Sequence, residues 1–406
     1  MLRPIPGGIT APGGFRAAGV SCGIKRRSAD AVAPLDLALL SADAPVPAAA
    51  LFTTNKAVAA PVLVSRERLE ASGRRAAVIV TNSGCANACT GASGLSVARA
   101  MADAAAAAVG CDPMHALVAS TGVIGVPLSL DKVRLGIDAA RLALRTDAGD
   151  DAAAAIMTTD PFPKSFAVIV ETPDGRYTIG GMAKGSGMIE PRMATMLGYL
   201  TTDARVDPAV LDAALRHVAD RTFNAITVDG EPSTNDTIFA LASGTAGVTV
   251  ERADDRHFVE ALMAVAGHLA REIVRGGEGA TKLVTVRITG AATAADARLA
   301  ARAIANSPLV KTAIHGADPN WGRLVSAAGR SGADFRLDEA SVCIGDVALF
   351  VRGVPYDERA AEAAAVLRGQ EMTVVVDLGT GGGHDTTMWT CDFSAEYVRI
   401  NAEYRT

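Results

Sequence analysis

The feature that most constrains the fold of this chain is the irregular mixture of strand-like and helix-like segments along its length. Apolar runs typical of β-strands occur at residues 76–81, 166–171, 283–289, 342–351 and 373–378. Ala-rich segments typical of helices occur at residues 95–109, 131–144, 208–221, 256–275 and 292–307. A doubly wound parallel sheet requires regular alternation of strands and helices. The pattern therefore favours an α+β fold built as a layered sandwich.

The length and composition of the chain indicate a globular protein with more than one hydrophobic core. At 406 residues the chain exceeds the usual size of a single domain. Its content of 49% hydrophobic and 20% charged residues excludes intrinsic disorder. The net charge of −5 offers no basic surface for nucleic acid or anionic membranes. We predict a main domain over residues 1–280 and a smaller C-terminal domain over residues 281–406.

The N-terminal segment and the cysteines bear on the cellular location. Residues 1–27 contain no apolar core of a signal peptide, and no apolar run reaches the roughly 18 residues of a membrane-spanning helix. The six cysteines are scattered along the chain, at positions 22, 85, 89, 111, 343 and 391. Such dispersion fits reduced thiols better than a disulfide framework. We therefore expect a cytoplasmic protein without a membrane partner.

The segment from Lys184 to Leu197 contains the most reactive chemistry that the sequence suggests. It opens with a Gly-rich turn and carries the Ala194–Thr195 bond between two methionines. Lys184-Gly-Ser does not form a Walker loop, because position 183 is Ala where that pattern requires Gly. If the Ala194–Thr195 bond were cleaved, Thr195 would gain a free α-amine beside its own hydroxyl. One residue would then supply both a nucleophile and its base.

A second candidate segment is Ser120-Thr-Gly-Val-Ile-Gly125, which follows a strand-like run. A Thr-Gly step at the end of a strand can present the Thr121 hydroxyl and the Gly122 N–H in one direction. An oxyanion hole is formed by two such hydrogen-bond donors. An ordinary turn is the alternative interpretation, since Thr-Gly steps are common in turns.

Two further Gly-rich loops have alternative interpretations. Residues 82–91 lie between a strand-like and a helical segment, where backbone N–H groups can hold an anion or where asparagines can form local turns. Glu278 lies in a Gly-rich setting just after a helical segment. It is suited either to an ordinary solvated loop or to contact with an ammonium group of a substrate.

The sequence indicates no catalytic site based on histidine or on a metal ion. Cys85 and Cys89 lack the accompanying ligands that a zinc site needs. His315 lies in a turn-rich polar segment, compatible with a site residue or with a hydrogen-bonded structural loop. His384 follows a run of glycines that predicts a flexible loop. Because no Ser/His/Asp order is apparent, the sequence favours a nucleophile that supplies its own base.

Taken together, these segments resemble the ornithine acetyltransferase family of arginine biosynthesis, also called bifunctional glutamate N-acetyltransferase/ornithine acetyltransferase. The resemblance extends over residues 14–406. Its ordered elements are the following residues: 81–91, 120–125, 156–160, 184–197, 222–225, 233–237, 277–283, 306–312, 318–323 and 397–406.

The resemblance implies a fold and a set of site residues. The fold is the layered αββα-like sandwich of self-processing aminopeptidases, with a smaller C-terminal α/β domain whose tail returns to the active site. The precursor is expected to cleave itself between Ala194 and Thr195 into an α chain and a β chain, which assemble as an α2β2 heterotetramer. Thr195 is then the nucleophile, and Thr121 and Gly122 form the oxyanion hole. The substrate-binding positions implied are Thr158, Lys184, Thr195, Glu278, Asn401 and Thr406.

The reaction implied is transfer of an acetyl group from N-acetyl-L-ornithine to L-glutamate through an acetyl-Thr195 ester, with ping-pong kinetics. No cofactor is expected, although acetyl-CoA is a possible second acetyl donor. The chain departs from the family at Glu190-Pro191-Arg192, where many members carry His-Pro-Asn. We expect this departure to alter the rate of self-cleavage, or contacts near the site, more than the acyl chemistry.

Two alternatives to this activity stay open at the level of sequence. A self-processing amidase or aminopeptidase would use the same Thr195 but release the acyl group to water. A non-enzymatic amino-acid-binding protein would never cleave its own chain. Dependence of turnover on an acceptor, and the number of polypeptides on a denaturing gel, distinguish these three possibilities.

Overall fold

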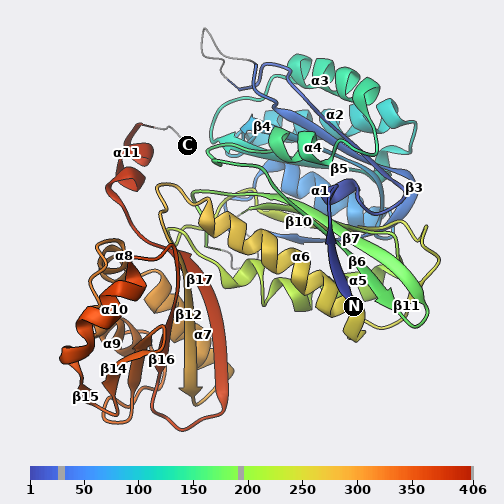
Figure 1. Cartoon of the computed structure of the whole chain (residues 1–406). Helices are drawn as coiled ribbons and strands as arrows, with labels where there is room; N and C mark the ends of the chain where they lie inside the picture. Colours follow the sequence, from blue (N-terminus) through green and yellow to red (C-terminus); the bar gives the residue numbers. More distant parts are fainter. Residues whose placement is uncertain (26–32, 191–195, 404–406) are drawn as a thin grey trace. The chain divides into compact units, whose positions relative to one another are not determined.

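The computed structural model describes residues 1–25, 33–190 and 196–403. These residues form two compact units (Figure 1). Among the described residues, the first unit comprises 1–224 and 231–273, and the second comprises 225–230 and 274–403. None of the helices in the described ranges is both long enough and apolar enough to span a bilayer. All six cysteines lie in these ranges and are free thiols.

A sheet of nine described strands organises the first unit. Its order is β1-β6-β7-β8-β10-β3-β4-β5, and β2 pairs with β3 outside this path. The strands are β1 (Leu2–Ile5), β2 (Phe15–Val20), β3 (Leu37–Phe52), β4 (Arg75–Cys85), β5 (Ala116–Val123), β6 (Lys164–Thr172), β7 (Gly175–Lys184), β8 (Leu197–Thr202) and β10 (Thr237–Ala242). Two short strands, β9 (Arg205–Val206) and β11 (Thr249–Val250), pair separately.

The long strand β3 joins two layers of this sheet. Its first half pairs with β2 and β4, its last residues pair with β10, and the register shifts between Ser41 and Val46. Ile79 and Leu117 of one layer belong to the same buried cluster as Tyr199 and Phe239 of the other. A hydrogen bond of 2.7 Å between the Thr81 and Tyr199 hydroxyls also joins the layers. The two layers therefore face each other across a largely apolar interior.

Helices cover the outer faces of both layers. On the first layer, Val78 and Val118 pack against Met101 and Ile137 in a second cluster, which involves α2 and α3. On the other layer, the His268 ring of α6 stacks on Phe166. The helices of this unit are α1 (Ala60–Ala71), α2 (Gly91–Val109), α3 (Leu130–Ala143), α4 (Gly149–Ala155), α5 (Pro208–Ala219) and α6 (Arg256–Arg275). The order helix, sheet, sheet, helix confirms the predicted α+β sandwich.

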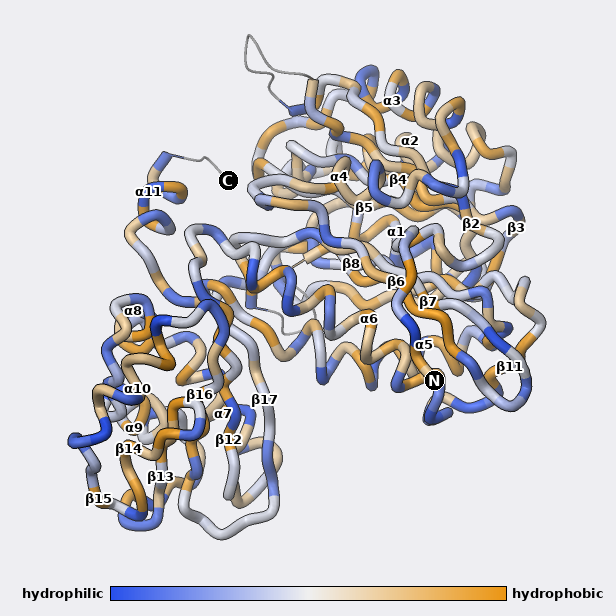
Figure 2. The backbone as a smooth tube through the Cα atoms, viewed as in Figure 1, coloured by the Kyte–Doolittle hydropathy of each residue, from blue (hydrophilic) through white to orange (hydrophobic). Residues whose placement is uncertain are grey.

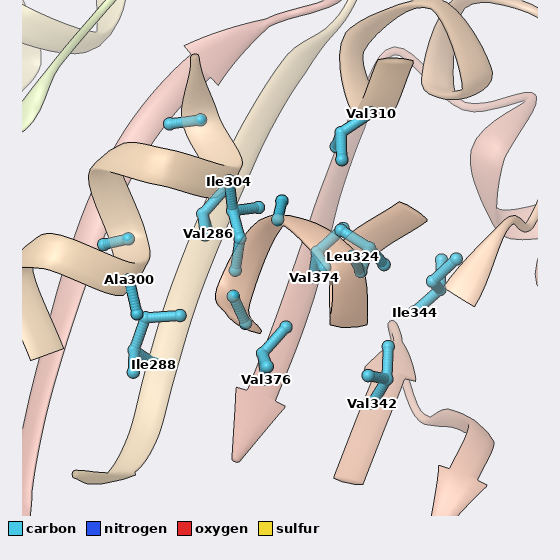
Figure 3. Close-up of a cluster of buried hydrophobic side chains, with 14 of the residues drawn as sticks. Val286, Ile288, Ala300, Ile304, Val310, Leu324, Val342, Ile344, Val374 and Val376 are labelled. Atoms are coloured by element: carbon cyan, nitrogen blue, oxygen red, sulfur yellow. The ribbon is translucent and has the colours of Figure 1, made fainter. Parts of the chain in front are cut away.

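The second unit is built on a six-stranded sheet with the order β15-β14-β13-β16-β12-β17. Its strands are β12 (Leu283–Ala291), β13 (Ser341–Ile344), β14 (Val347–Val351), β15 (Val354–Pro355), β16 (Glu371–Asp377) and β17 (His384–Cys391). Its helices are α7 (Ala294–Ala305), α8 (Pro308–His315), α9 (Trp321–Gly329), α10 (Ala360–Leu367) and α11 (Ala395–Glu403). Figure 3 shows Val286, Val374 and Val376 of the sheet beside Ile304 and Leu324 of the helices.

Hydropathy follows these elements. In Figure 2 the hydrophobic colour runs along helices and strands, whereas the turns around β14 and β15 are hydrophilic.

The segment 225–230 joins the second unit because the Thr227 N–H donates to the Trp389 carbonyl on β17, at 2.9 Å. Residues 225–230 are separated in sequence from the rest of the second unit, and a strand-like pairing with β17 joins them to it.

Local sequence signals predicted many of these elements, with one error. The helix predicted at residues 208–221 is α5, and the Asp207 side chain caps its start by accepting the Ala209 N–H. Residues 342–351 are not one strand but two, β13 and β14, because Gly345 turns the chain with a φ of 58°. The glycine run before His384 lies in a turn outside helices and strands, and His384 itself begins β17 and pairs with Ala291.

Candidate active site

Thr121 and Gly122 lie at the end of β5, where sheet pairing fixes the backbone. Thr121 is in register with Ser83 of the parallel strand β4, and Gly122 is in register with Gly84. Gly122 has a φ of 126°, and a Cβ atom there would lie 2.4 Å from the Gly84 carbonyl carbon. Only glycine allows this combination of a positive φ and a close backbone approach. Gly122 is therefore a requirement of the fold at this position.

Polar side chains from three segments hold the ends of β4 and β5 in place. The Asn235 amide donates to the Ala86 and Ser120 carbonyls, at 2.6 and 2.8 Å. The Ser120 hydroxyl donates to the Asn82 side-chain oxygen at 2.6 Å. Asn82 in turn donates to the Cys85 carbonyl at 2.8 Å. This buried network fixes the backbone immediately before Thr121.

The predicted Gly-rich loop at residues 82–91 satisfies its own polar groups. Asn87 is buried, donates to the Gly94 carbonyl at 2.9 Å and accepts the Thr90 hydroxyl at 2.8 Å. Local asparagine-based turns, one of the two interpretations of this loop, account for these contacts. The loop supports the end of β5 and the start of α2.

Lys184 reaches Thr121 from the opposite layer of the sandwich. Leu117, Ala119 and Thr121 occupy alternate positions on β5, while Met182 and Lys184 do so on β7; alternate residues of a strand share a face. Leu117, Ala119 and Met182 line the interior between the layers, so the same rows direct Thr121 and Lys184 inward. The Lys184 ammonium donates to the Thr121 hydroxyl oxygen at 3.1 Å, and both side chains are buried.

Thr158 is connected to the same place through Asp160. The Thr158 N–H donates to one carboxylate oxygen of Asp160 at 3.0 Å. The other oxygen accepts the Gly185 N–H at 2.7 Å and the Lys164 ammonium at 2.6 Å. Burial alone would raise the pKa of Asp160, but the charges of Lys164 and Lys184 and the hydrogen bonds prevail and lower it to about 2. Asp160 is therefore a buried anion.

A third lysine contributes to the electrostatics of this region. The Lys25 ammonium donates to the Leu35 carbonyl at 2.7 Å, and its backbone N–H donates to buried Asp36. Burial lowers the pKa of Lys25; the attraction of Asp36 and Asp160 opposes this effect, while repulsion by Lys184 adds to it. Lys25, Lys164 and Lys184 all interact electrostatically with Asp160, and this excess of positive charge favours an anionic ligand.

In the second unit, Glu278 and Asn401 contact each other directly. The Asn401 amide donates to the Glu278 carboxylate at 2.8 Å, and Glu278 is buried. Gly279 has a φ of 67°, and a Cβ there would lie 2.4 Å from the Tyr397 nitrogen of α11. The Ser394 hydroxyl donates to the Gly279 carbonyl at 2.6 Å. Tight packing of α11 on the Gly-rich loop therefore brings the two predicted residues together.

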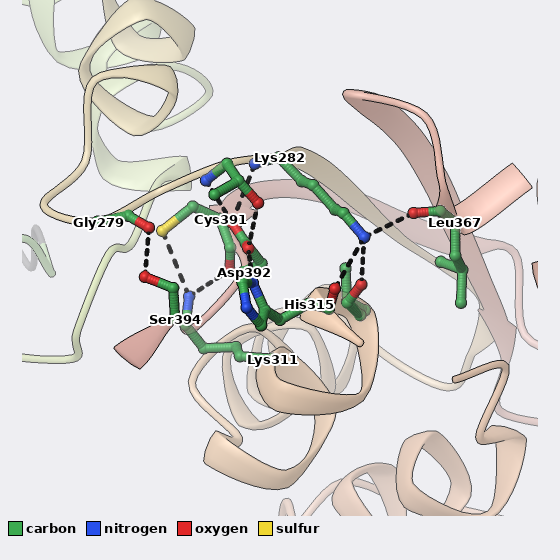
Figure 4. Close-up of polar contacts among 10 residues, drawn as sticks. Gly279, Lys282, Lys311, His315, Leu367, Cys391, Asp392 and Ser394 are labelled. Atoms are coloured by element: carbon green, nitrogen blue, oxygen red, sulfur yellow. Dashed lines mark hydrogen bonds and ion pairs between the residues drawn. The ribbon is translucent and has the colours of Figure 1, made fainter. Parts of the chain in front are cut away.

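A polar cluster beside this loop was not predicted from the sequence. Buried Asp392 accepts the backbone N–H groups of Thr281 and Lys282, and it contacts Nδ1 of His315 at 2.6 Å (Figure 4). Burial tends to raise the pKa of Asp392, but its hydrogen bonds with Thr281 and His315 lower it. For His315, the hydrogen-bonded structural interpretation fits these contacts.

Two lysines complete the cluster by satisfying main-chain carbonyls. The Lys282 ammonium donates to the carbonyls of Ile314, His315 and Leu367, as the dashed lines in Figure 4 show. Buried Lys311 donates to the Thr390 hydroxyl at 2.7 Å. Unpaired carbonyls at helix ends are costly to bury, so these bonds stabilise the last turns of α8 and α10. We assign the cluster a structural role.

The predicted site residues thus form two groups. Thr121, Gly122, Thr158 and Lys184 converge in the first unit, and Glu278 contacts Asn401 in the second. Ala194, Thr195 and Thr406 lie outside the described residues. Across residues 1–25, 33–190 and 196–403, no group of three or more His, Cys, Asp or Glu side chains is arranged to hold a metal ion.

Comparison with known proteins gives a consistent family. Residues 16–406 match the ArgJ family. The arginine biosynthesis bifunctional protein ArgJ of Symbiobacterium thermophilum is 51% identical over 405 residues, covering 99% of both chains. The protein of the same name from Dehalococcoides mccartyi is 46% identical, covering 98% of both.

A solved structure agrees with the sequence comparisons. The crystal structure of arginine biosynthesis bifunctional protein ArgJ from Bacillus halodurans is 42% identical, with a TM-score of 0.50; the match covers 52% of this chain and 100% of that one. The family match covers nearly the whole length, and the relatives match end to end. The chain therefore belongs to the ArgJ family.

Proposed function

We propose that this protein is a self-processing acetyltransferase that moves the acetyl group of N-acetyl-L-ornithine to L-glutamate. The observation that carries the proposal is the pairing at the start of β8. Leu197, its first residue, is in register with Lys184, and only Met196 separates Thr195 from Leu197. Since Lys184 contacts Thr121, β8 begins beside the candidate oxyanion site, two residues after Thr195 in the sequence. The name shared by the relatives, arginine biosynthesis bifunctional protein, supports the same pathway.

In the proposed mechanism, self-cleavage frees the α-amine of Thr195. An α-amine has a pKa of about 7.7–8.0, so a substantial neutral fraction is available near pH 7 to accept the hydroxyl proton. The Thr195 oxygen then attacks the acetyl carbonyl of the donor, and the amide bond breaks as L-ornithine leaves with a proton. The acetyl group stays on Thr195 as an ester.

The geometry of Thr121 suits it to stabilise the oxyanion. Its oxygen accepts a hydrogen bond from the Lys184 ammonium. The Thr121 O–H can therefore donate to a developing negative charge, together with the Gly122 N–H. A donor polarised by a neighbouring cation is stronger than a neutral one.

The second half-reaction reverses the first. The amine of L-glutamate attacks the ester, forms N-acetyl-L-glutamate and returns the proton to Thr195. We assign Lys184 to the carboxylate that both amino acids carry, and Glu278 to a cationic amine, on the basis of charge complementarity. Thr158, Asn401 and Thr406 are further proposed substrate contacts. No cofactor takes part in this scheme, although acetyl-CoA is proposed as a possible additional donor.

The experiment that tests this function is incubation of the protein with N-acetyl-L-ornithine, with and without L-glutamate. A transferase turns over only when glutamate is present, and it then releases ornithine and N-acetylglutamate in equal amounts. Without glutamate it releases a single burst of ornithine, as the acetyl ester forms. Equal ornithine release without glutamate would identify an amidase and contradict the proposal. Replacement of N-acetylornithine by acetyl-CoA in the same assay measures the second donor activity. Analytical ultracentrifugation of the processed protein tests the proposed α2β2 assembly.

A further inference from the structure

We infer that Asp160 is a positioning residue that fixes Lys184 and Thr158 for recognition of the substrate carboxylate. The inference rests on the proposed function and concerns a residue that the scheme above leaves without a role. Asp160 lies in the segment between α4 and β6 and is buried, with no exposed side-chain surface.

The contacts of Asp160 join two segments that are distant in sequence. One oxygen accepts the N–H of Thr158, itself a proposed substrate contact. The other accepts the N–H of Gly185, the residue bonded directly to Lys184. The Ser186 hydroxyl donates to the Thr159 carbonyl at 3.5 Å and adds a second link between the same segments. One carboxylate therefore sets the spacing between Thr158 and the end of β7.

Asp160 also supplies the negative charge that the lysines require. The Lys164 ammonium contacts it at 2.6 Å with no exposed side-chain surface, and Lys184 is near enough to attract it. Buried ammonium groups without a counter-charge are strongly unfavourable. Lys25 adds a further positive charge, which repels Lys184. Asp160 thus allows a buried lysine to remain beside Thr121 as a binding group for a carboxylate.

A purely structural role is the competing explanation, because Asp160 and Lys164 could form a buried pair that only stabilises the fold. The two explanations differ in substrate selectivity. Loss of stability lowers the amount of active protein and reduces all reactions equally. Displacement of Lys184 has a further effect on substrates that carry the α-carboxylate, since a misplaced cation loses its charge-assisted contact. Any weakening of the Thr121 donor slows all acetyl donors alike and cancels in a comparison between them.

The test compares two acetyl donors, N-acetyl-L-ornithine and N-acetyl-1,4-diaminobutane, which is the same molecule without its α-carboxylate. The ratio of kcat/KM for the two donors, with glutamate as acceptor, measures carboxylate recognition. In Asp160→Asn we expect this ratio to fall at least about ten-fold, equivalent to about 1.4 kcal/mol. The KM for glutamate should rise in parallel, because the acceptor presents the same group.

The double variant Asp160→Asn/Lys164→Met keeps the test decisive if the single variant folds poorly. It removes the whole buried pair, and such replacements are often tolerated. The positioning role predicts a folded double variant with the same loss of selectivity. A double variant with the wild-type ratio would overturn the inference, and so would an unchanged ratio in Asp160→Asn.

Asp203→Asn is the matched control. Asp203 is a buried carboxylate of the same unit that accepts the N–H groups of Thr178 and Gly13, at 2.6 and 3.2 Å. Its variant should keep the wild-type ratio. Failure of the proposed function appears separately, as absence of acetyl transfer to glutamate in the wild-type protein.

Discussion

Gly122 offers the sharpest test of the geometry at the end of β5, and its natural control lies three residues further along the chain. Both Gly122 and Gly125 have a positive φ, of 126° and 77°. A Cβ atom at Gly122 would lie 2.4 Å from the Gly84 carbonyl carbon and 2.6 Å from the Cys85 nitrogen. A Cβ atom at Gly125 would meet nothing within 4 Å. The two positions share backbone strain but differ in steric overlap.

The expected magnitudes follow from this difference. An alanine at a positive φ costs about 1 kcal/mol of folding stability, which is the whole effect expected for Gly125→Ala. Overlap with a fixed backbone adds about 1–3 kcal/mol, so Gly122→Ala should lose about 2–4 kcal/mol. Relief of the overlap must separate β4 from β5 and move the Gly122 N–H. Loss of one oxyanion donor lowers kcat about 10²- to 10³-fold.

The assay is urea unfolding of both variants, together with the rate of acetyl transfer from N-acetyl-L-ornithine to glutamate. Gly122→Ala should be the less stable variant and should lose kcat by the larger factor. Equal stability and equal kcat for the two variants would refute the argument, because the overlap at Gly122 would then have no consequence.

Three further predictions concern the stability of the first unit. The native pKa of Asp160 is about 2 and its unfolded value is 3.8, so its stabilising contribution of about 2 kcal/mol is complete above pH 4 and disappears as the pH falls towards 2. Urea unfolding between pH 5 and pH 2 should show this loss in the wild type, and an equally steep loss in Asp160→Asn would contradict the assignment. Tyr199→Phe removes the bond to the Thr81 hydroxyl and should cost about 1–3 kcal/mol, measured by thermal unfolding; the double variant with Thr81→Val should regain part of it, and no recovery would argue against that bond. Asp207→Ala removes the cap of α5 and should cost about 1 kcal/mol with unchanged kcat, whereas a neutral effect on stability would show that the cap is unimportant.

Sequence patterns predicted the elements whose signals are local. The apolar run of β4 and the Ala-rich helices α2 and α5 each depend on neighbouring residues. The role of β3 could not be predicted in this way. Its pairing with β2, β4 and β10 joins residues separated by up to about two hundred positions, which no local pattern specifies.

In the candidate site, sequence motifs likewise identified individual residues, whereas contacts between distant segments required the structure. Resemblance to the family identified Thr121, Gly122, Thr158 and Lys184, and the structure brings these side chains and backbone groups into one region. Asp160 received no role, although a signal was available: Asp160 and Lys164 are opposite charges four residues apart within an otherwise apolar, Pro-rich segment. Its hydrogen bond with the Gly185 N–H forms only because the fold brings two distant segments together, so the sequence alone could not predict it.

The contact between Asp392 and His315 also could not be predicted from the sequence. The two residues are separated by 77 positions, and neither lies in a recognisable motif with the other. Their contact follows from the packing of α8 against the end of β17, which only the assembled second unit defines. The sequence left two interpretations of His315 because both require polar neighbours, and only the structure identifies those neighbours.

The central claim is that cleavage before Thr195 creates the nucleophile, and N-terminal sequencing combined with an acetyl-transfer assay tests it most directly. The wild type should run as two polypeptides on a denaturing gel, one of which begins at Thr195, and should transfer acetyl from N-acetyl-L-ornithine to glutamate. Thr195→Ser keeps a hydroxyl and should retain both properties in reduced measure, whereas Thr195→Ala should run as one intact chain without transfer. Full transfer by an intact Thr195→Ala chain would contradict the account.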